Sequence, residues 1–113
     1  MEKADMYVSL SPAEAAEKVK TAVTESFSGE ILDEYKRAVS DGKEIILIVF
    51  EKYYMRSNNR ATLTFLADNL EGKTKVHLAA GGGSEGMIFR FDWGASSSFG
   101  ELAEKALKEF VCE

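Results

Sequence analysis

The sequence predicts an α+β fold with two layers, an antiparallel sheet of five to six strands and two helices on one face of it. A nearly continuous apolar run spans Ile45 to Phe50 and is expected to form the centre of the sheet. Segments that alternate between apolar and polar residues follow it as far as Trp93, which is the pattern of half-buried strands. Amphipathic segments with helix-capping residues occur near both ends of the chain. With 113 residues, the chain fits a single domain over residues 1–113.

The N-terminal part of the chain predicts a short strand followed by a helix. Residues 4–10 alternate between apolar and polar side chains, which indicates a strand. Ser11 can cap a helix, Pro12 suits its first position, and Glu14 completes a capping box. We predict this helix over about residues 12–27. Its apolar face is expected to include Val19, Val23 and Phe27.

Residues 30–39 fit two kinds of secondary structure. Their apolar positions, which are Ile31, Leu32, Tyr35, Ala38 and Val39, have helical spacing. Asp41-Gly42 is instead a hairpin turn signal just before the apolar run, and it slightly favours a strand over 30–39 paired with a strand over 44–54. Because the part of this strand over residues 44–50 is apolar on both faces, it needs neighbours along both edges and cover on both sides.

Three alternating segments after this strand predict further strands, over residues 61–68, 74–80 and 87–93. A tight turn at Glu71-Gly72 pairs Phe65 with Leu78, so that apolar side chains meet on one face. Closing the glycine-rich loop 81–86 then pairs Leu78 with Phe89. The segment 74–93 is therefore expected to form a hairpin.

The C-terminal part predicts a second helix over about residues 99–111, with Ser98 as its cap and Glu101 as the partner in a capping box. Its apolar stripe is expected to contain Phe99, Leu102, Ala103, Ala106, Leu107 and Phe110. An antiparallel sheet curled around a C-terminal helix resembles a reduced helix-grip or TBP-like arrangement. That resemblance concerns the fold and implies no function.

The predicted register places polar side chains on the face of the sheet opposite the core. His77 shares one row with Leu66 and Arg90, and Asp92 shares the next row with Lys75. One interpretation is a site in which His77 binds a proton or an anion with help from Arg90 and Asp92. The favoured interpretation is a solvated sheet face whose opposite charges set the strand register.

The most unusual run extends from Glu51 to Arg60. It contains Tyr53, Tyr54, Arg56 and Arg60, and Tyr and Arg side chains are enriched at binding interfaces. The same residues also fit a strand end that leads into a polar loop. We predict this run as the best candidate for a contact surface.

The glycine-rich segment Gly81 to Gly86 has the composition of a phosphate-binding loop. The known loops of that kind lead into a helix, whereas a strand is predicted after this one. A flexible hairpin loop is the favoured interpretation, and close approach of a ligand or a partner backbone stays open.

Composition and charge exclude several classes of function. The net charge of −5 argues against a nucleic-acid or anionic-membrane surface. The chain has no apolar run of about 18 residues and no basic, then apolar, N-terminus, so we predict neither a membrane span nor a signal peptide. Its single cysteine, Cys112, cannot form an internal disulfide and fits the reducing cytoplasm. One histidine and one cysteine do not make a recognisable metal site, and no metal or other cofactor is predicted.

Three runs together resemble a known family. They are the run from Val49 to Ala61, then Gly81-Gly82-Gly83, then the run from Phe89 to Ala95. The combination is similar to a small bacterial family of uncharacterised proteins, a domain of unknown function, over nearly the whole chain. The resemblance implies a compact bacterial cytoplasmic domain and assigns a role to no residue.

These observations support three hypotheses about function. The favoured one is a non-catalytic interaction or binding module that forms a homo-oligomer or binds another protein, because strand 45–50 has two apolar faces and a Tyr/Arg run beside it. The alternative is a small-molecule carrier or sensor with a pocket between the sheet and the last helix. Its expected lining is Phe89, Phe91, Trp93 and Phe110. The least favoured is a small enzyme that uses His77, Arg90 and Asp92.

Overall fold

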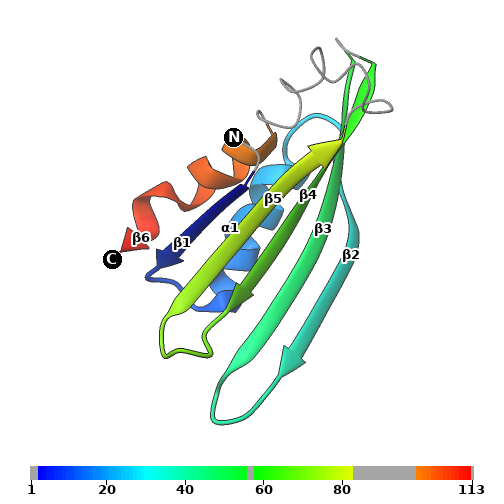
Figure 1. Cartoon of the computed structure of the whole chain (residues 1–113). Coiled ribbons are helices and arrows are strands. Elements are labelled where there is room, and N and C mark those ends of the chain that lie inside the picture. Colours follow the sequence, from blue (N-terminus) through cyan, green and yellow to red (C-terminus); the bar gives the residue numbers. More distant parts are fainter. Residues whose placement is uncertain (1–2, 56–57, 83–98, 113) are drawn as a thin grey trace.

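A computed structural model describes residues 3–55, 58–82 and 99–112 of the chain. Figure 1 shows its strands and helices. The elements are β1 (Lys3–Val8), α1 (Pro12–Thr24), β2 (Gly29–Ala38), β3 (Glu44–Tyr54), β4 (Asn59–Asp68), β5 (Thr74–Gly82), a second helix over residues 99–107, η1 (Lys108–Phe110) and β6 (Val111–Cys112).

The strands form one six-stranded sheet in the order β2-β3-β4-β5-β1-β6, and each neighbouring pair is antiparallel. Four antiparallel steps separate β2 from β1 in this order, so these two strands run in the same direction. Parallel strands need a crossover connection, and α1 provides it by crossing one face of the sheet (Figure 1). The predicted α+β class, with an antiparallel sheet of five to six strands and two helices, is confirmed.

The start of α1 follows the prediction, and its end does not. The Ser11 side chain accepts a hydrogen bond from the backbone N–H of Glu14, and the Glu14 carboxylate accepts one from the N–H of Ser11. This capping box satisfies two backbone groups that the first helical turn leaves unpaired. The helix ends at Thr24 rather than near residue 27. Phe27, predicted on the apolar face, therefore lies beyond the helix and is 70% exposed.

The hydrophobic core lies between the sheet and the two helices, which cover the same face of it (Figure 1). The buried residues of the helices are Pro12, Ala15, Ala16, Val19, Val23, Phe99, Ala103 and Leu107. Those of the sheet include Val8, Ile46, Ile48, Phe50, Leu63, Phe65, Val76 and Leu78. The other face of the sheet is the one on which a site can be open to solvent.

Residues 29–38 form a strand, which settles the choice between helix and strand. Asp41 and Gly42 have φ angles of 49° and 78°, which a type I′ turn requires at both central positions. The turn directs β2 back along β3 with Tyr35 opposite Leu47. The pairing with β3 shifts between Ile31 and Asp33, which marks a β-bulge near the start of β2.

The register between β4 and β5 is confirmed, because Phe65 lies opposite Leu78. The other edge of β5 pairs with β1, where Ala4 lies opposite Leu78. The predicted pairing of Leu78 with Phe89 is therefore wrong, since both edges of β5 are occupied at that position. The predicted strand 87–93 itself lies outside the described residues.

The second helix begins at residue 99 in the described part of the chain and ends at residue 107, earlier than predicted. The chain then forms η1 and turns into β6, which pairs with β1. As a result Phe110 is only partly buried and packs against the margin of the core.

Candidate functional site

The open face of the sheet carries the predicted residue His77, whose side chain is 40% exposed. Leu66 of β4 lies opposite it on one side, as predicted. Asp5 of β1 lies opposite it on the other side. The predicted row that joins His77 to Arg90 is wrong, because Asp5 occupies the position assigned to Arg90.

The neighbouring row needs the same correction. Lys75 lies opposite Asp68, and Tyr7 occupies the position assigned to Asp92. The ammonium groups of Lys73 and Lys75 lie 4.7 and 6.0 Å from the centroid of the Tyr7 ring. These cation–π contacts link β1 to β5 and to the turn before it.

The pair formed by His77 and Asp5 is the main polar contact between β1 and β5 on this face. Nδ1 of His77 lies 2.5 Å from Oδ1 of Asp5. The hydrogen bond with His77 lowers the pKa of the Asp5 carboxyl below its usual value. Both side chains are solvent-accessible, at 40% and 58% exposed, so the pair can exchange protons with water but does not enclose a substrate.

Tyr53 and Arg60 form a connected cluster at the end of the β3–β4 hairpin. Nη1 of Arg60 donates to Oε1 of Glu51 over 3.1 Å, and the guanidinium lies 5.6 Å from the centroid of the Tyr53 ring. The Tyr53 hydroxyl donates to Oδ1 of Asn58 over 2.6 Å. The polar groups of this cluster thus have partners within the hairpin, which favours a structural role in ordering the hairpin end.

Tyr54 lies on the opposite face from Tyr53 and packs against the core. Burial raises the pKa of its hydroxyl. The neighbouring Lys52 has its ammonium 5.4 Å from the Tyr54 ring centroid, donates to the backbone oxygen of Phe27, and has a pKa lowered by burial. Tyr53 and Tyr54 of the predicted run therefore lie on opposite faces of the sheet.

The predicted site residues do not come together within the described part of the chain. Arg60 and Leu66, the neighbour of His77, are six residues apart along β4, which is about 20 Å at the usual rise of a strand. Three of the predicted residues, Arg56, Arg90 and Asp92, lie outside the described residues. Of the three residues predicted for a catalytic role, His77 lies within the described residues, and it lies beside Asp5.

An apolar strip lies in the middle of the open face. It is formed by Ile45, Leu47, Val49 and Leu66, which are all half-buried. Leu47 lies between Leu66 on β4 and Tyr35 on β2, so the strip crosses three strands. The continuous apolar run of β3 indicated an apolar second face, but the contributions of Leu66 and Tyr35 depend on pairings that only the structure shows.

The β2 strand carries exposed apolar side chains along the edge of the sheet. They are Ile31, Leu32 and Tyr35, with Val39 just after the strand. Nearly the whole strand is exposed on both faces, because it extends past the helix layer (Figure 1). The apolar strip and β2 together, called the β2–β3 surface below, join half-buried and exposed apolar side chains across the pairing of β2 with β3.

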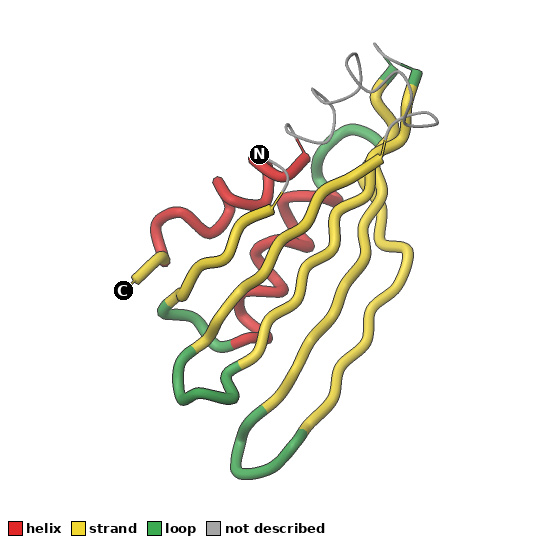
Figure 2. The backbone as a smooth tube through the Cα atoms, viewed as in Figure 1, coloured by secondary structure: helices red, strands yellow, loops and turns green. Residues whose placement is uncertain are grey.

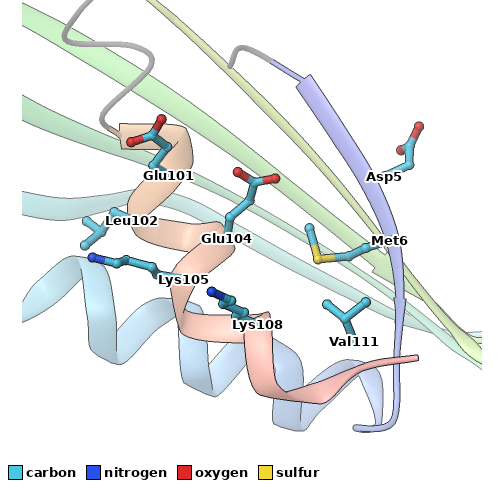
Figure 3. A pocket seen from close by; sticks show the side chains of 8 residues that line it. All are labelled: Asp5, Met6, Glu101, Leu102, Glu104, Lys105, Lys108 and Val111. Carbon is cyan, nitrogen blue, oxygen red and sulfur yellow. The ribbon is translucent and has the colours of Figure 1, made fainter. Parts of the chain in front are cut away.

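A groove of about 770 Å³ separates β1 from the second helix. Figure 3 shows its lining of Asp5, Met6, Glu101, Leu102, Glu104, Lys105, Lys108 and Val111. Acidic and basic side chains are mixed along this groove, so it selects for neither sign of charge. Phe110, predicted to line a pocket here, is not part of the lining.

Within residues 3–55, 58–82 and 99–112, no group of three or more His, Cys, Asp or Glu residues is placed to hold a metal ion. Neither helix in that part of the chain is long and apolar enough to cross a membrane. Three features of the described residues are thus candidates for a function. They are the His77–Asp5 pair, the β2–β3 surface and the groove.

Together these observations define a small two-layer α+β domain. Among the residues that the structure describes, its sheet has one face covered by helices, one open face and one long free edge. The chain belongs to the Family of unknown function (DUF6054), whose family model matches residues 1–111. This match confirms the predicted membership of a domain family without an assigned function. Comparison with curated proteins and with solved structures gives no match.

Proposed function

We propose that this protein is a non-catalytic interaction module of the bacterial cytoplasm that self-associates through the β2–β3 surface. The observation that carries the proposal is the exposure of β2, where Leu32 and Tyr35 are 52% and 50% exposed. Apolar side chains of this size on an accessible sheet edge favour contact with another protein surface.

The apolar strip extends the same surface inward. Tyr35 lies beside Leu47, and Leu47 lies beside Leu66, so a partner on β2 can also contact the apolar strip on the open face. The ring of Tyr35 provides a large contact area with few rotatable bonds. Charged residues flank Tyr35 on both sides along β2, and this arrangement of an apolar centre with a polar rim is typical of protein interfaces.

The other features give less support to a function of their own. The His77–Asp5 pair lies on an open face, and its two members already satisfy each other. The Tyr53–Arg60 cluster is held by contacts within one hairpin. A catalytic role needs a place where a substrate can be held against the reacting groups, and neither feature provides one in the described part of the chain.

Sedimentation velocity over a wide range of protein concentration tests the proposal. We expect a reversible increase in mass with concentration. The variant Leu32→Lys should weaken this association, whereas Leu70→Lys, at a 44% exposed position in the turn between β4 and β5, should not. A protein that stays monomeric at the highest concentration reached would reject self-association.

The groove beside β1 supports a second candidate function, that of a small-molecule carrier or sensor. Its volume of about 770 Å³ is sufficient for a drug-sized ligand. Screening a fragment library by NMR tests this candidate, with the methyl signal of Met6 as the reporter. Fragments that shift Met6 and not Leu70 would support it, and the absence of any such fragment would count against it.

A further inference from the structure

The two edges of the sheet differ in length. On one side β6 consists of Val111–Cys112 and pairs with Tyr7 and Val8 alone, so this edge is made of β6 and, within the described residues, the short stretch Lys3–Met6 of β1. β2 has 10 residues, and within the described residues it pairs with β3 alone (Figure 2). The free edge of a strand presents unpaired backbone N–H and C=O groups, to which another strand can add. β2 is therefore the longer of the two edges at which this sheet can be extended.

The charged side chains of β2 are sorted by sign around Tyr35. Asp33 and Glu34 precede it, and Lys36 and Arg37 follow it. Their partners on β3 show that Asp33, Tyr35 and Arg37 share the open face, whereas Glu34 and Lys36 share the helix face. Reversing the direction of this strand exchanges its acidic and basic halves. A second copy of β2 that runs antiparallel thus presents the opposite charge at each of these positions.

We propose that β2 pairs antiparallel with β2 of a second copy of this chain, with Tyr35 of one copy opposite Tyr35 of the other. This inference rests on the proposed function and specifies its interface. In this register Asp33 faces Arg37 of the second copy, and Glu34 faces Lys36 of the second copy. A twofold axis through the Tyr35 pair repeats both contacts. The two sheets join into one, with the helices of both copies on the same side.

The order of charges selects this register over its neighbours. Moving the axis to Glu34 places that residue opposite Glu34 of the second copy, and moving it to Lys36 brings the two Lys36 side chains together. Like charges directly opposite each other destabilise a strand pair. The bulge between Ile31 and Asp33 interrupts the regular strand just before the charged segment, so the segment available for pairing begins at about Asp33.

Charges on an edge strand often prevent unwanted pairing. A strand with charges of one sign repels its own copy in every register. In β2 the signs are divided, so the same charges exclude most registers and permit one. Because the charged pairs are exposed to solvent, added salt should weaken the association.

Cross-linking with a single cysteine tests the position of the axis. The chain's own Cys112 is exposed and is first replaced by Ser. In that background, Tyr35→Cys places a thiol opposite its own copy, where antiparallel strands bring Cα atoms about 4.5–5.5 Å apart, within the range of a disulfide. We expect mild oxidation to give a covalent dimer. Arg37→Cys is the matched control, because its thiol meets position 33 and is about 13 Å from its own copy.

Exchange of charge across the interface provides an independent test. Asp33→Arg and Arg37→Asp each create two like-charge contacts with their own copy, and we expect each to raise the dissociation constant about tenfold or more. In an equal mixture of the two variants, however, position 33 of each chain faces a residue of opposite charge at position 37 of the other chain. We expect mixing to restore a dimer that contains one chain of each variant, measured by native mass spectrometry.

The outcomes separate this inference from the function on which it rests. If the unmodified protein dimerises but Tyr35→Cys does not cross-link and the two charge variants dimerise normally, self-association stands and the β2 register is wrong. Equal cross-linking of Tyr35→Cys and Arg37→Cys would also overturn the register. If the unmodified protein is monomeric at every concentration, both proposals fail, and β2 is then an edge protected by its charges.

Discussion

β4 and β2 have the same length, 10 residues, and lie in one sheet, yet they have opposite environments. In β4 each alternate residue is buried, from Asn59 to Ala67, because the strand lies beneath the helices with neighbours on both sides. In β2 every residue after Gly29 is exposed. A strand can therefore be well paired and still bury almost nothing, if it lies at the edge beyond the second layer.

The comparison of β4 with β2 distinguishes the residues that stabilise the monomer from the residues that are accessible to a partner. Burial of β4 excludes water from the core and stabilises the monomer. The side chains of β2 add little to that core, and the contact of Glu34 with Lys20 of α1 lies near solvent. For this reason we place stability in the β1, β3, β4 and β5 region and interaction at β2.

Phe65→Ala should have the largest effect on stability. The side chain is fully buried in β4, and its removal leaves a cavity between the sheet and the helices. We expect the free energy of unfolding to fall by about 3–5 kcal/mol, which is a large part of the stability of a domain of this size. Urea denaturation followed by circular dichroism measures the change.

The matched variant Tyr35→Ala removes an aromatic ring from β2. We expect a loss of about 0.5 kcal/mol in dilute protein, because the ring is half exposed and its main contact is across the strand pair. Similar losses for Phe65→Ala and Tyr35→Ala would contradict the division between a stabilising region and an interacting one.

Gly29→Ala should have the next largest effect, because Gly29 is the point at which β2 meets the helix layer. A Cβ atom there would lie 2.1 Å from the backbone oxygen of Val23 and 2.8 Å from Oγ of Ser26. Relief of this clash must move the end of α1 or the start of β2. We expect a loss of about 1–3 kcal/mol in the free energy of unfolding, measured by thermal and urea denaturation.

Gly81→Ala is the control for this substitution. Gly81 also lies in a strand, and a Cβ atom there meets no atom of the described residues within 4 Å. The added methyl group should change stability by at most about 0.5 kcal/mol. If Gly29→Ala were as mild as Gly81→Ala, the junction between α1 and β2 would be looser than the structure indicates.

The parts of the fold that could be predicted from the sequence depend on local signals. The capping box at Ser11, the turn at Asp41-Gly42 and the register of Phe65 with Leu78 each involve residues close in sequence. The pairing of β1 with β5 joins segments about 70 residues apart, and nothing in either segment identifies the other. Neighbouring strands in sequence usually pair, so the incorrect hairpin over 74–93 followed the more common arrangement.

The candidate site was less predictable than the fold for the same reason. The parity of β5 placed His77 on the open face, but its partner depends on which strand occupies the neighbouring edge. The Tyr53–Tyr54 run was predicted as one surface, although adjacent residues of a strand point to opposite faces. Exposure of β2 could not be predicted, since α1 ends three residues before the predicted helix end and its position over the sheet is a tertiary property.

Lys20→Met tests the ionic link between the two regions. Nζ of Lys20 lies 2.9 Å from Oε2 of Glu34 on β2 and 3.1 Å from Oε2 of Glu17. The bond with Glu34 is the main cause that raises the pKa of Lys20 above 10.5. Because the pair is near solvent, we expect a loss of about 0.2–1 kcal/mol in the free energy of unfolding, and less in high salt.

The difference in stability between the natural protein and Lys20→Met should become smaller at high pH. A raised pKa in the folded state means that the contribution of Lys20 is fully present below pH 10.5 and is lost as the pH rises through the folded-state value. Urea denaturation of the natural protein and of Lys20→Met at neutral pH and above pH 10.5 should therefore give converging stabilities. A loss that is unchanged at high pH would assign the effect to packing of the Lys20 stem.

The smallest expected effect, at Asp5, gives the sharpest test of how β1 is paired. The hydrogen bond with His77 is the main cause that lowers the pKa of Asp5 below 3.8. A lowered pKa in the folded state contributes stability above pH 3.8 that is lost as the pH falls through the folded-state value. In His77→Ala we expect the pKa of Asp5 to rise toward 3.8, measured from the carboxyl ¹³C shift in an NMR titration. An Asp5 titration that His77→Ala leaves unchanged would mean that β1 does not bring Asp5 opposite His77, and the pairing of β1 with β5 would then be wrong.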